Sequence, residues 1–188
     1  MYENLNKILN SAFLVILLLV PQLFRETKQF QAIISNETSA IVDELQKQNI
    51  VMGRAIGDGG ERPKQYDNFI KLKSTATIDE LLALTNHKNP VVRCYLFWAL
   101  SYHHLVDLKP IIYSHITDDE EVATMFGCFS LNEKVGDFFI NTVTYGSFDL
   151  KTKKLDSAQF TILDSILINT QNNLFARSRA IRRSKQST

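Results

Sequence analysis

The chain has 188 residues, a formal net charge of +1 at pH 7, and 45% hydrophobic against 22% charged residues. This length suits one domain with a sizeable hydrophobic core, and the composition excludes bulk disorder. The balanced charge excludes a global electrostatic attraction for nucleic acid or for acidic partners.

Residues 8–20 form a nearly unbroken apolar run, ILNSAFLVILLLV. A run of about 13 apolar residues matches the core of a secretory signal better than a membrane span, which needs about 20. Extension through Phe24 approaches spanning length. Residues 1–24 are therefore expected to be a signal peptide or an uncleaved signal anchor, and the alternative is an apolar helix of the core. The expected location is export, either periplasmic or anchored to a membrane by this segment.

Residues 25–56 are expected to form an N-terminal helix, because apolar residues recur in them at helical spacing. Residues 57–65 follow as a loop that holds three glycines and a proline. No lysine followed by serine or threonine closes this loop and no strand is expected before it, which argues against a phosphate-binding loop. We interpret it as a flexible connection to the helical region.

Residues 66–175 are expected to be a succession of helices. Thr77 and Glu80 match a capping box, and Asn89 with Pro90 is a typical helix start. Further helix starts are expected at Asp107, at Asp118 or Asp119, at Val135, and at Asp156 or Ser157. No convincing run of alternating strand residues is found, so the predicted fold class is all-α.

The helical region contains an internal repeat of about thirty residues. In this register Leu81–Leu82 aligns with Ile111–Ile112, and Val92 aligns with Val122. Each unit would be a short helix, a polar turn and a longer second helix. A period of this size built of helix pairs is typical of an α-solenoid.

The stretch NPVVRCYLFWAL, residues 89–100, resembles the second helix of a HEAT repeat. It has Asn-Pro in the turn, Val-Arg in the first helical turn and Ala-Leu near the end. The resemblance implies a short α-solenoid of HEAT-like helix pairs, in which Arg93 bonds Asp118 or Asp119 in the turn of the next unit. The longer sequence is also similar to a group of uncharacterised exported bacterial HEAT-like proteins. That similarity implies a cell-envelope location and carries no established activity.

Helix 91–103 would present Cys94, Phe97, Trp98 and Tyr102 to the groove of such a solenoid. A bare apolar patch of this kind favours aggregation, so a further element must cover it. The apolar stripe of the N-terminal helix, from Phe30 to Leu45, is free to do so, with Tyr66, Phe69 and Ile70 as further candidates. We therefore expect a solenoid with the N-terminal helix packed on it.

Candidate chemistry is sparse. The histidines are His87, His103, His104 and His115, and none are spaced to place two metal ligands on one helical face. No metal and no cofactor are expected. In the thirty-residue register the Cα atoms of Cys94 and Cys128 would lie about 10 Å apart, too far for a disulfide. Both thiols are therefore expected to be free and mostly buried.

Residues 176–188 are basic and are expected to be a solvated tail. The favoured function is a non-catalytic protein-interaction module of the cell envelope, with another protein as partner and with membrane contact through residues 1–24 if they are uncleaved. One alternative is an enzyme of unknown type that uses Cys128 and nearby histidines. Another is nucleic-acid or phosphate binding through the basic tail, which an exported protein has little occasion for.

The residues singled out fall into two groups. Those expected to hold the fold together are Arg93, Asp118, Asp119, Trp98 and Cys94. The candidate interaction residues are His87, His103, His104, Arg179, Arg182 and Arg183.

Overall fold

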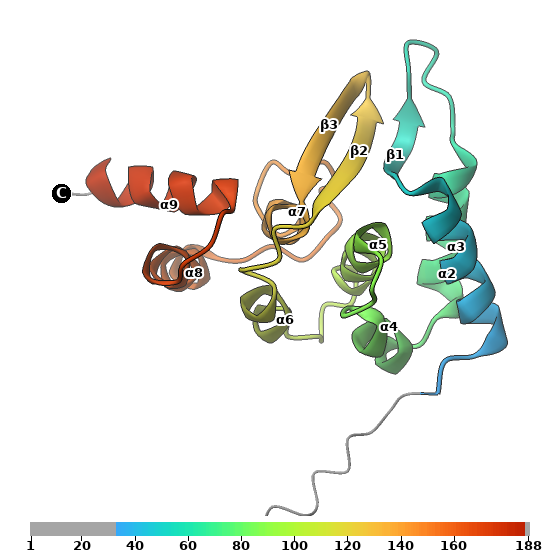
Figure 1. Cartoon of the computed structure of the whole chain (residues 1–188), viewed down its shortest axis with the longest axis horizontal. Helices are drawn as coiled ribbons and strands as arrows, with labels where there is room; N and C mark the ends of the chain where they lie inside the picture. Colours follow the sequence, from blue (N-terminus) through green and yellow to red (C-terminus); the bar gives the residue numbers. More distant parts are fainter. Residues whose placement is uncertain (1–32, 187–188) are drawn as a thin grey trace, which may run out of the picture. The chain divides into compact units, whose positions relative to one another are not determined.

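The computed structural model describes residues 33–186 (Figure 1). Eight helices and three strands occur in this part of the chain, and the strands form one mixed sheet. The predicted all-α solenoid is therefore wrong. Residues 1–24, the expected signal segment, lie outside the described residues, and no helix among the described residues is long and apolar enough to cross a membrane.

The first described helix, α2 (Asn36–Gln48), is much shorter than the helix expected over residues 25–56. Ser35 begins it, because the Ser35 side chain accepts a hydrogen bond from a backbone N–H of the first turn. Asn49 ends it in the left-handed conformation at φ 52°, which asparagine tolerates better than most residues. The chain then enters strand β1 (Val51–Ile56) instead of continuing the helix.

A glycine-containing turn joins β1 to helix α3 (Lys64–Thr75). Ile56 and Glu61 exchange two backbone hydrogen bonds across this turn, of 2.8 and 2.9 Å. Gly57 and Gly60 adopt positive φ values, 67° and 64°, which an L side chain would strain. The glycines therefore shape a tight turn at the end of a strand.

Helices α4 (Ile78–Leu84) and α5 (Pro90–Leu100) begin at the predicted residues. Thr77 and Glu80 form the capping box of α4. The Asn89 side chain accepts a backbone N–H at the start of α5, with proline in the first turn. Local capping chemistry thus predicts both helix starts correctly.

A β-hairpin takes the place of the long helix expected in the second repeat. After α6 (Lys109–Ser114) the chain forms β2 (Glu121–Gly127) and β3 (Phe129–Lys134). A long second helix beginning at Asp118 or Asp119 was expected here, so the thirty-residue repeat does not continue beyond α6. Burial alternates along the first part of β2, where Val122 and Thr124 are buried and their neighbours are more exposed.

Strand β2 lies in the middle of the sheet. It pairs antiparallel with β3, with Thr124 opposite Leu131, and parallel with β1, with Thr124 opposite Val51. Gly127 makes the turn to β3 at φ 60°. Hydrogen bonds on both edges of β2 stabilise a strand where the local spacing alone suits a helix.

Three helices complete the described chain: α7 (Val135–Thr142), α8 (Ser157–Asn169) and α9 (Phe175–Gln186). The starts of α7 and α8 agree with the sequence, and Asp156 forms a capping box at α8. The basic tail expected over residues 176–188 is a helix through Gln186. It packs against α8 and α7.

Helix α5 is the centre of the core, with α2, α3, α4, α7, β1 and β2 in contact with it (Figure 1). Trp98 stacks on Phe69 of α3 with ring centroids 4.0 Å apart, and Phe97 stacks on Phe139 of α7 at the same distance. The face of α5 that the sequence predicts to be covered is therefore covered, by α3 at Trp98 and by α7 at Phe97. Helix α2 packs beside it against both α3 and α5.

Candidate functional site

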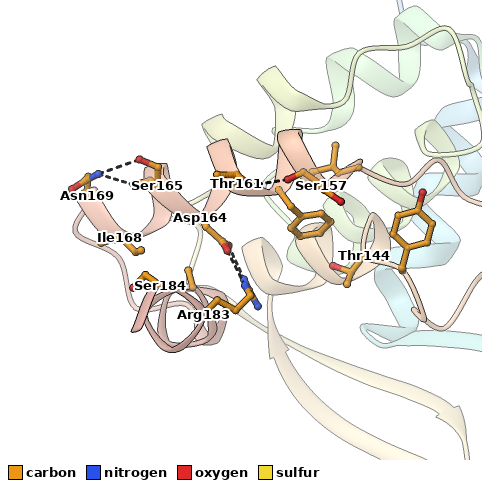
Figure 2. Close-up of a pocket in the computed structure, with 13 residues that line it drawn as sticks. Thr144, Ser157, Thr161, Asp164, Ser165, Ile168, Asn169, Arg183 and Ser184 are labelled. Atoms are coloured by element: carbon orange, nitrogen blue, oxygen red, sulfur yellow. Dashed lines mark hydrogen bonds and ion pairs between the residues drawn. The ribbon is translucent and has the colours of Figure 1, made fainter. Parts of the chain in front are cut away.

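A groove of about 780 Å³ lies along helices α8 and α9 (Figure 2). We call it the α8–α9 groove. Thr144 and Tyr145, which follow α7, and Leu155, which precedes α8, complete its wall. The helical residues that line it are Ser157, Phe160, Thr161, Asp164, Ser165, Ile168, Asn169, Ala180, Arg183 and Ser184.

Two polar side chains fix α9 against the rest of the chain. The buried carboxylate of Asp137 on α7 accepts hydrogen bonds from the backbone N–H groups of Phe175, at 2.8 Å, and Ala176, at 2.7 Å. A carboxylate at this position satisfies N–H groups that the first turn of a helix leaves unpaired. In the connection between the helices, the Asn172 amide donates to the Leu167 carbonyl at 3.0 Å.

An ion pair joins the two helices of the groove. Figure 2 shows Asp164 of α8 and Arg183 of α9 pointing toward each other. Arg183 Nε lies 2.7 Å from Asp164 Oδ2, and Arg183 Nη2 lies 2.6 Å from Asp164 Oδ1. The hydrogen bond to Asp164 raises the pKa of Arg183 above its ordinary value. The Arg183 side chain is 49% exposed, so this pair orients the helices more than it stabilises them.

Three hydroxyl groups of the groove donate to backbone carbonyls of their own or the preceding helix. Thr161 Oγ1 donates to the Ser157 carbonyl at 2.9 Å, and Ser184 Oγ donates to the Ile181 carbonyl at 2.8 Å. Thr144 Oγ1 bonds the preceding helix in the same way, at 2.7 Å. These hydroxyl protons are therefore committed, and the groove presents mainly carbon surface to a ligand.

Helix α8 leaves apolar side chains uncovered. Leu163 and Leu167 are fully buried, but Ile162 is 54% exposed, and Phe175 at the start of α9 is 58% exposed. A helix that is apolar on nearly all sides is usually buried on all sides. The structure covers only one side of α8.

The charge around the groove is positive. Helix α9 holds five cationic residues and no acidic residue, and α8 holds a single acidic residue, Asp164. Arg177 lies 3.5 Å from the neutral Ile168 carbonyl and Arg182 is exposed, so neither is neutralised by these contacts. Arg179 donates to the Asn141 side chain at 2.9 Å and also pairs with the Asp137 carboxylate at 3.7 Å. A negatively charged partner would be attracted to this side of the chain.

Arg93 contacts the turn that the sequence predicts, through Asp118. The guanidinium is 7% exposed; its Nη2 lies 3.0 Å from Asp118 Oδ1 and 2.7 Å from Glu120 Oε2, and its Nη1 lies 2.8 Å from the His87 carbonyl. The other expected partner, Asp119, instead accepts a hydrogen bond from the Asn173 side chain. Arg93 therefore joins the start of α5 to the turn before β2. It has this structural role although the chain does not form the predicted solenoid.

The residues of the enzyme alternative do not assemble. Cys128 lies at the hairpin turn, is exposed, and has as its polar contact among the described residues Asp58 Oδ1, at 3.5 Å. His87 lies in the turn before α5, and His103 and His104 follow α5. No cluster of three metal-ligating side chains occurs among the described residues.

The two cysteines differ in environment. Both are free, Cys94 is fully buried in α5, and burial raises the pKa of its thiol well above the ordinary value. A thiol held protonated in this way is a poor nucleophile. The expectation that both would be mostly buried is wrong for Cys128, because a hairpin turn replaces the predicted helix.

Comparison with protein-family models, with curated proteins and with solved structures finds no match for the chain. The geometry of its own residues is therefore the evidence on function.

The sequence analysis does not predict the α8–α9 groove, although the sequence contains one indication of it. The stretch AQFTILDSILI carries apolar residues over most of the helix surface, with Thr161, Asp164 and Ser165 on the remaining face. This pattern indicates either deep burial or an apolar face without a cover. Of the predicted interaction residues, Arg183 lines the groove, and Arg179 and Arg182 lie on the same helix. The three histidines are not among the lining residues.

Proposed function

We propose that the protein is a non-catalytic interaction module that binds an acidic amphipathic helix of a partner protein in the α8–α9 groove. The observation that carries this proposal is the mainly carbon surface of the groove, with Phe160 and Ile168 of α8 in its lining beside the basic helix α9. Exposed apolar surface next to a groove is typical of protein-binding faces. The location in the cell envelope rests on residues 1–24 and stays a prediction, which cell fractionation would test.

The size and lining of the groove suit apolar side chains carried by a helix. A volume of about 780 Å³ is within the range of pockets that bind small ligands, and it is open along the two helices. An amphipathic helix places apolar side chains at positions i, i+3, i+4 and i+7 on one face, which is how helices bind in grooves. Phe160 and Ile168, two turns apart on α8, provide carbon surface for such contacts.

The charge of the groove favours an acidic partner. Arg182 and Lys185 are exposed on α9, whereas Arg183 at the groove is already paired with Asp164. Acidic side chains that flank the apolar face of a bound helix would lie near these cations. Such rim charges mainly raise the rate of association and select the partner.

Nucleic-acid binding through the basic tail has less support. Three of the α9 arginines point into their own chain: Arg177 to a carbonyl, Arg179 to an amide and Arg183 to a carboxylate. A phosphate-binding surface uses arginines whose donors are available to the ligand. Among the described residues, the candidate nucleophile Cys128 has no histidine as a hydrogen-bond partner; its partner is the exposed Asp58 carboxylate.

A peptide-display selection tests the proposal. The full protein would be used to select binders from a library of random 15-residue peptides, and the enriched peptides would be synthesised and titrated by fluorescence anisotropy. We expect a consensus with apolar residues at helical spacing and with Asp or Glu between them. The double variant Arg182→Glu, Lys185→Glu should weaken binding, and the weakening should grow at low salt.

Two tryptophan variants serve as a matched pair. Ser165→Trp places a large side chain in the groove and should abolish binding, whereas Ser178→Trp, at an exposed position of α9 outside the lining, should leave it unchanged. Enriched peptides that bind Ser165→Trp normally would overturn the proposal, and so would a basic consensus. A dimer in sedimentation velocity that Ser165→Trp dissociates would also overturn it, because a second copy would then occupy the groove.

A further inference from the structure

A second pocket, of about 330 Å³, forms where β1, α3, α5, β2 and the segment after α7 meet. We call it the aromatic pocket. Segments far apart in the sequence contribute to it, so it exists only in the folded chain. Its aromatic residues are Tyr66, Trp98, Tyr102, Phe126 and Phe148.

The rings of this pocket are held in fixed positions. Trp98 is 2% exposed, and Phe148 meets it edge-on with ring centroids 5.1 Å apart. Phe126 and Phe148 lie 4.4 Å apart. Gly53 of β1 makes this packing possible, because a Cβ atom there would lie 2.6 Å from Cδ1 of Phe126. The rings therefore form a preorganised wall.

The carboxylate of Asp149 is occupied by the protein itself. It accepts hydrogen bonds from the Trp98 indole N–H at 2.9 Å, from the Lys151 backbone N–H at 3.0 Å and from the Tyr102 hydroxyl. Burial alone would raise the pKa of Asp149, but the hydrogen bonds outweigh burial and hold the pKa below its ordinary value. Asp149 therefore stays ionised and orients the wall, with little capacity left for a ligand.

Three cationic side chains line the same pocket: Arg54, Lys73 and Lys151. Within residues 33–186, none of the three is in an ion pair with a carboxylate. The ammonium of Lys73 lies 3.8 Å from the centroid of the Tyr102 ring. The pocket therefore holds three cationic side chains and one carboxylate, that of Asp149, which is already hydrogen-bonded within the protein. Its net charge is positive.

A cationic ligand is the obvious alternative, since aromatic cages with a carboxylate bind quaternary ammonium groups. Here the chain supplies its own cation, because Lys73 already occupies the face of Tyr102. Burial lowers the pKa of Lys73, because desolvation disfavours its charged form. A second ammonium would also meet Arg54 and Lys151.

We infer that the aromatic pocket binds a small planar anion, an aromatic ring that carries a carboxylate or phosphate group. The ring would pack against the aromatic wall, and the anionic group would accept hydrogen bonds from the guanidinium of Arg54 and the ammonium groups of Lys73 and Lys151. The volume is at the lower end of ligand pockets and suits a ligand of one or two rings. This site is separate from the α8–α9 groove, with which it shares no lining residue.

The chain offers a built-in reporter, because Trp98 is its single tryptophan. The indole N–H of Trp98 gives one resonance in a ¹H–¹⁵N spectrum of the full protein. The probes are benzoate and phenyl phosphate, with benzamide, benzylammonium and inorganic phosphate as comparisons. We expect the two ring-bearing anions to shift this resonance saturably, and to bind at least about tenfold more tightly than the neutral, cationic and ringless probes.

Two lysines on α3 form a matched pair of variants. Lys73→Ala should weaken binding of phenyl phosphate about tenfold. Lys71→Ala removes an exposed lysine two residues earlier that does not line the pocket, and it should change nothing. Arg54→Ala, an exposed position, tests the same site without disturbing the core. Tighter binding of benzylammonium than of benzoate would overturn the inference, as would the absence of any saturable shift with the two anions.

Discussion

The carboxylate of Asp137 on α7 accepts a hydrogen bond from the backbone N–H of Ala176 on α9, at 2.7 Å. Asp137 is 1% exposed and Ala176 is 1% exposed, so this contact lies inside the packed interior. One helix is thus capped by a side chain of another. This carboxylate therefore helps to set the position of α9, and with it one wall of the α8–α9 groove.

Replacement of that carboxylate should release α9. We expect Asp137→Ala to lower the free energy of unfolding by about 2 kcal/mol, through lost capping and two unpaired N–H groups. Hydrogen exchange should speed up over residues 175–178 before it does so in α5. Asp164→Asn, which weakens only the half-exposed ion pair with Arg183, should cost less than about 1 kcal/mol. Equal effects of the two variants would contradict the capping role.

Arg93 should be a strong determinant of stability. Arg93→Ala would leave the part-buried His87 carbonyl without this donor and Asp118 with His115 as its remaining side-chain partner, and we expect a loss of about 2 to 4 kcal/mol in denaturant titrations. Arg93→Lys should recover only part of it, because a lysine cannot span the same set of acceptors. The control is Arg182→Ala, at an exposed position, with an expected change within about 0.5 kcal/mol.

Glu80 should make the free energy of unfolding depend on pH in the acidic range. Its carboxylate accepts the backbone N–H groups of Ser35 and Thr77, both at 2.8 Å, and these bonds lower the pKa of Glu80 from 4.5 to about 2. Since the folded pKa is the lower one, the stabilisation is complete above pH 4.5 and is lost as the pH falls toward 2.

Denaturant titrations at several pH values would measure this effect. We expect Glu80→Gln to cost about 1 to 2 kcal/mol at pH 7, and this difference from the unsubstituted protein should shrink below pH 4.5. Asp79→Asn, the exposed neighbour on α4, should show no comparable change. A difference that stays constant down to pH 2.5 would contradict the assignment.

Gly136 should not tolerate a side chain. A Cβ atom there would lie 2.5 Å from the His115 carbonyl oxygen and 2.6 Å from Leu174 Cδ1. Because the carbonyl belongs to the backbone, Gly136→Ala must move α7 or the turn before β2, at a cost of about 1 to 3 kcal/mol in thermal melts. Gly59→Ala, whose nearest neighbour would be 3.8 Å away, should melt within about 2 °C of the unsubstituted protein.

Capping residues explain which parts of the fold the sequence predicts well. Asn89 with Pro90 and the Thr77–Glu80 pair act within one helical turn, so their effect is visible locally. The hairpin is different, because EVATMFG becomes a strand through its pairing with β1, which is distant in the chain. Local spacing does not contain that information.

The two candidate sites are harder to predict for the same reason. The apolar composition of α8 is readable, but the groove beside it depends on where Asp137 holds α9. Trp98 is an obvious core residue, yet its meeting with Phe148 and Asp149 follows from the path of the chain after α7. Such convergence is set by the tertiary packing and not by local pattern.

The parallel pairing of β1 with β2 constrains the order of events during folding. Val51 meets Thr124 only after four intervening helices, α3 to α6, have been placed. Contacts that close such long loops are slow to form, because the loop entropy is lost before the contact is gained. During synthesis β1 therefore leaves the ribosome well before its partner, with its backbone donors and acceptors available to other chains. Because β1 is short and ends in a tight glycine turn, the strand edge that stays unpaired until β2 has been synthesised is also short.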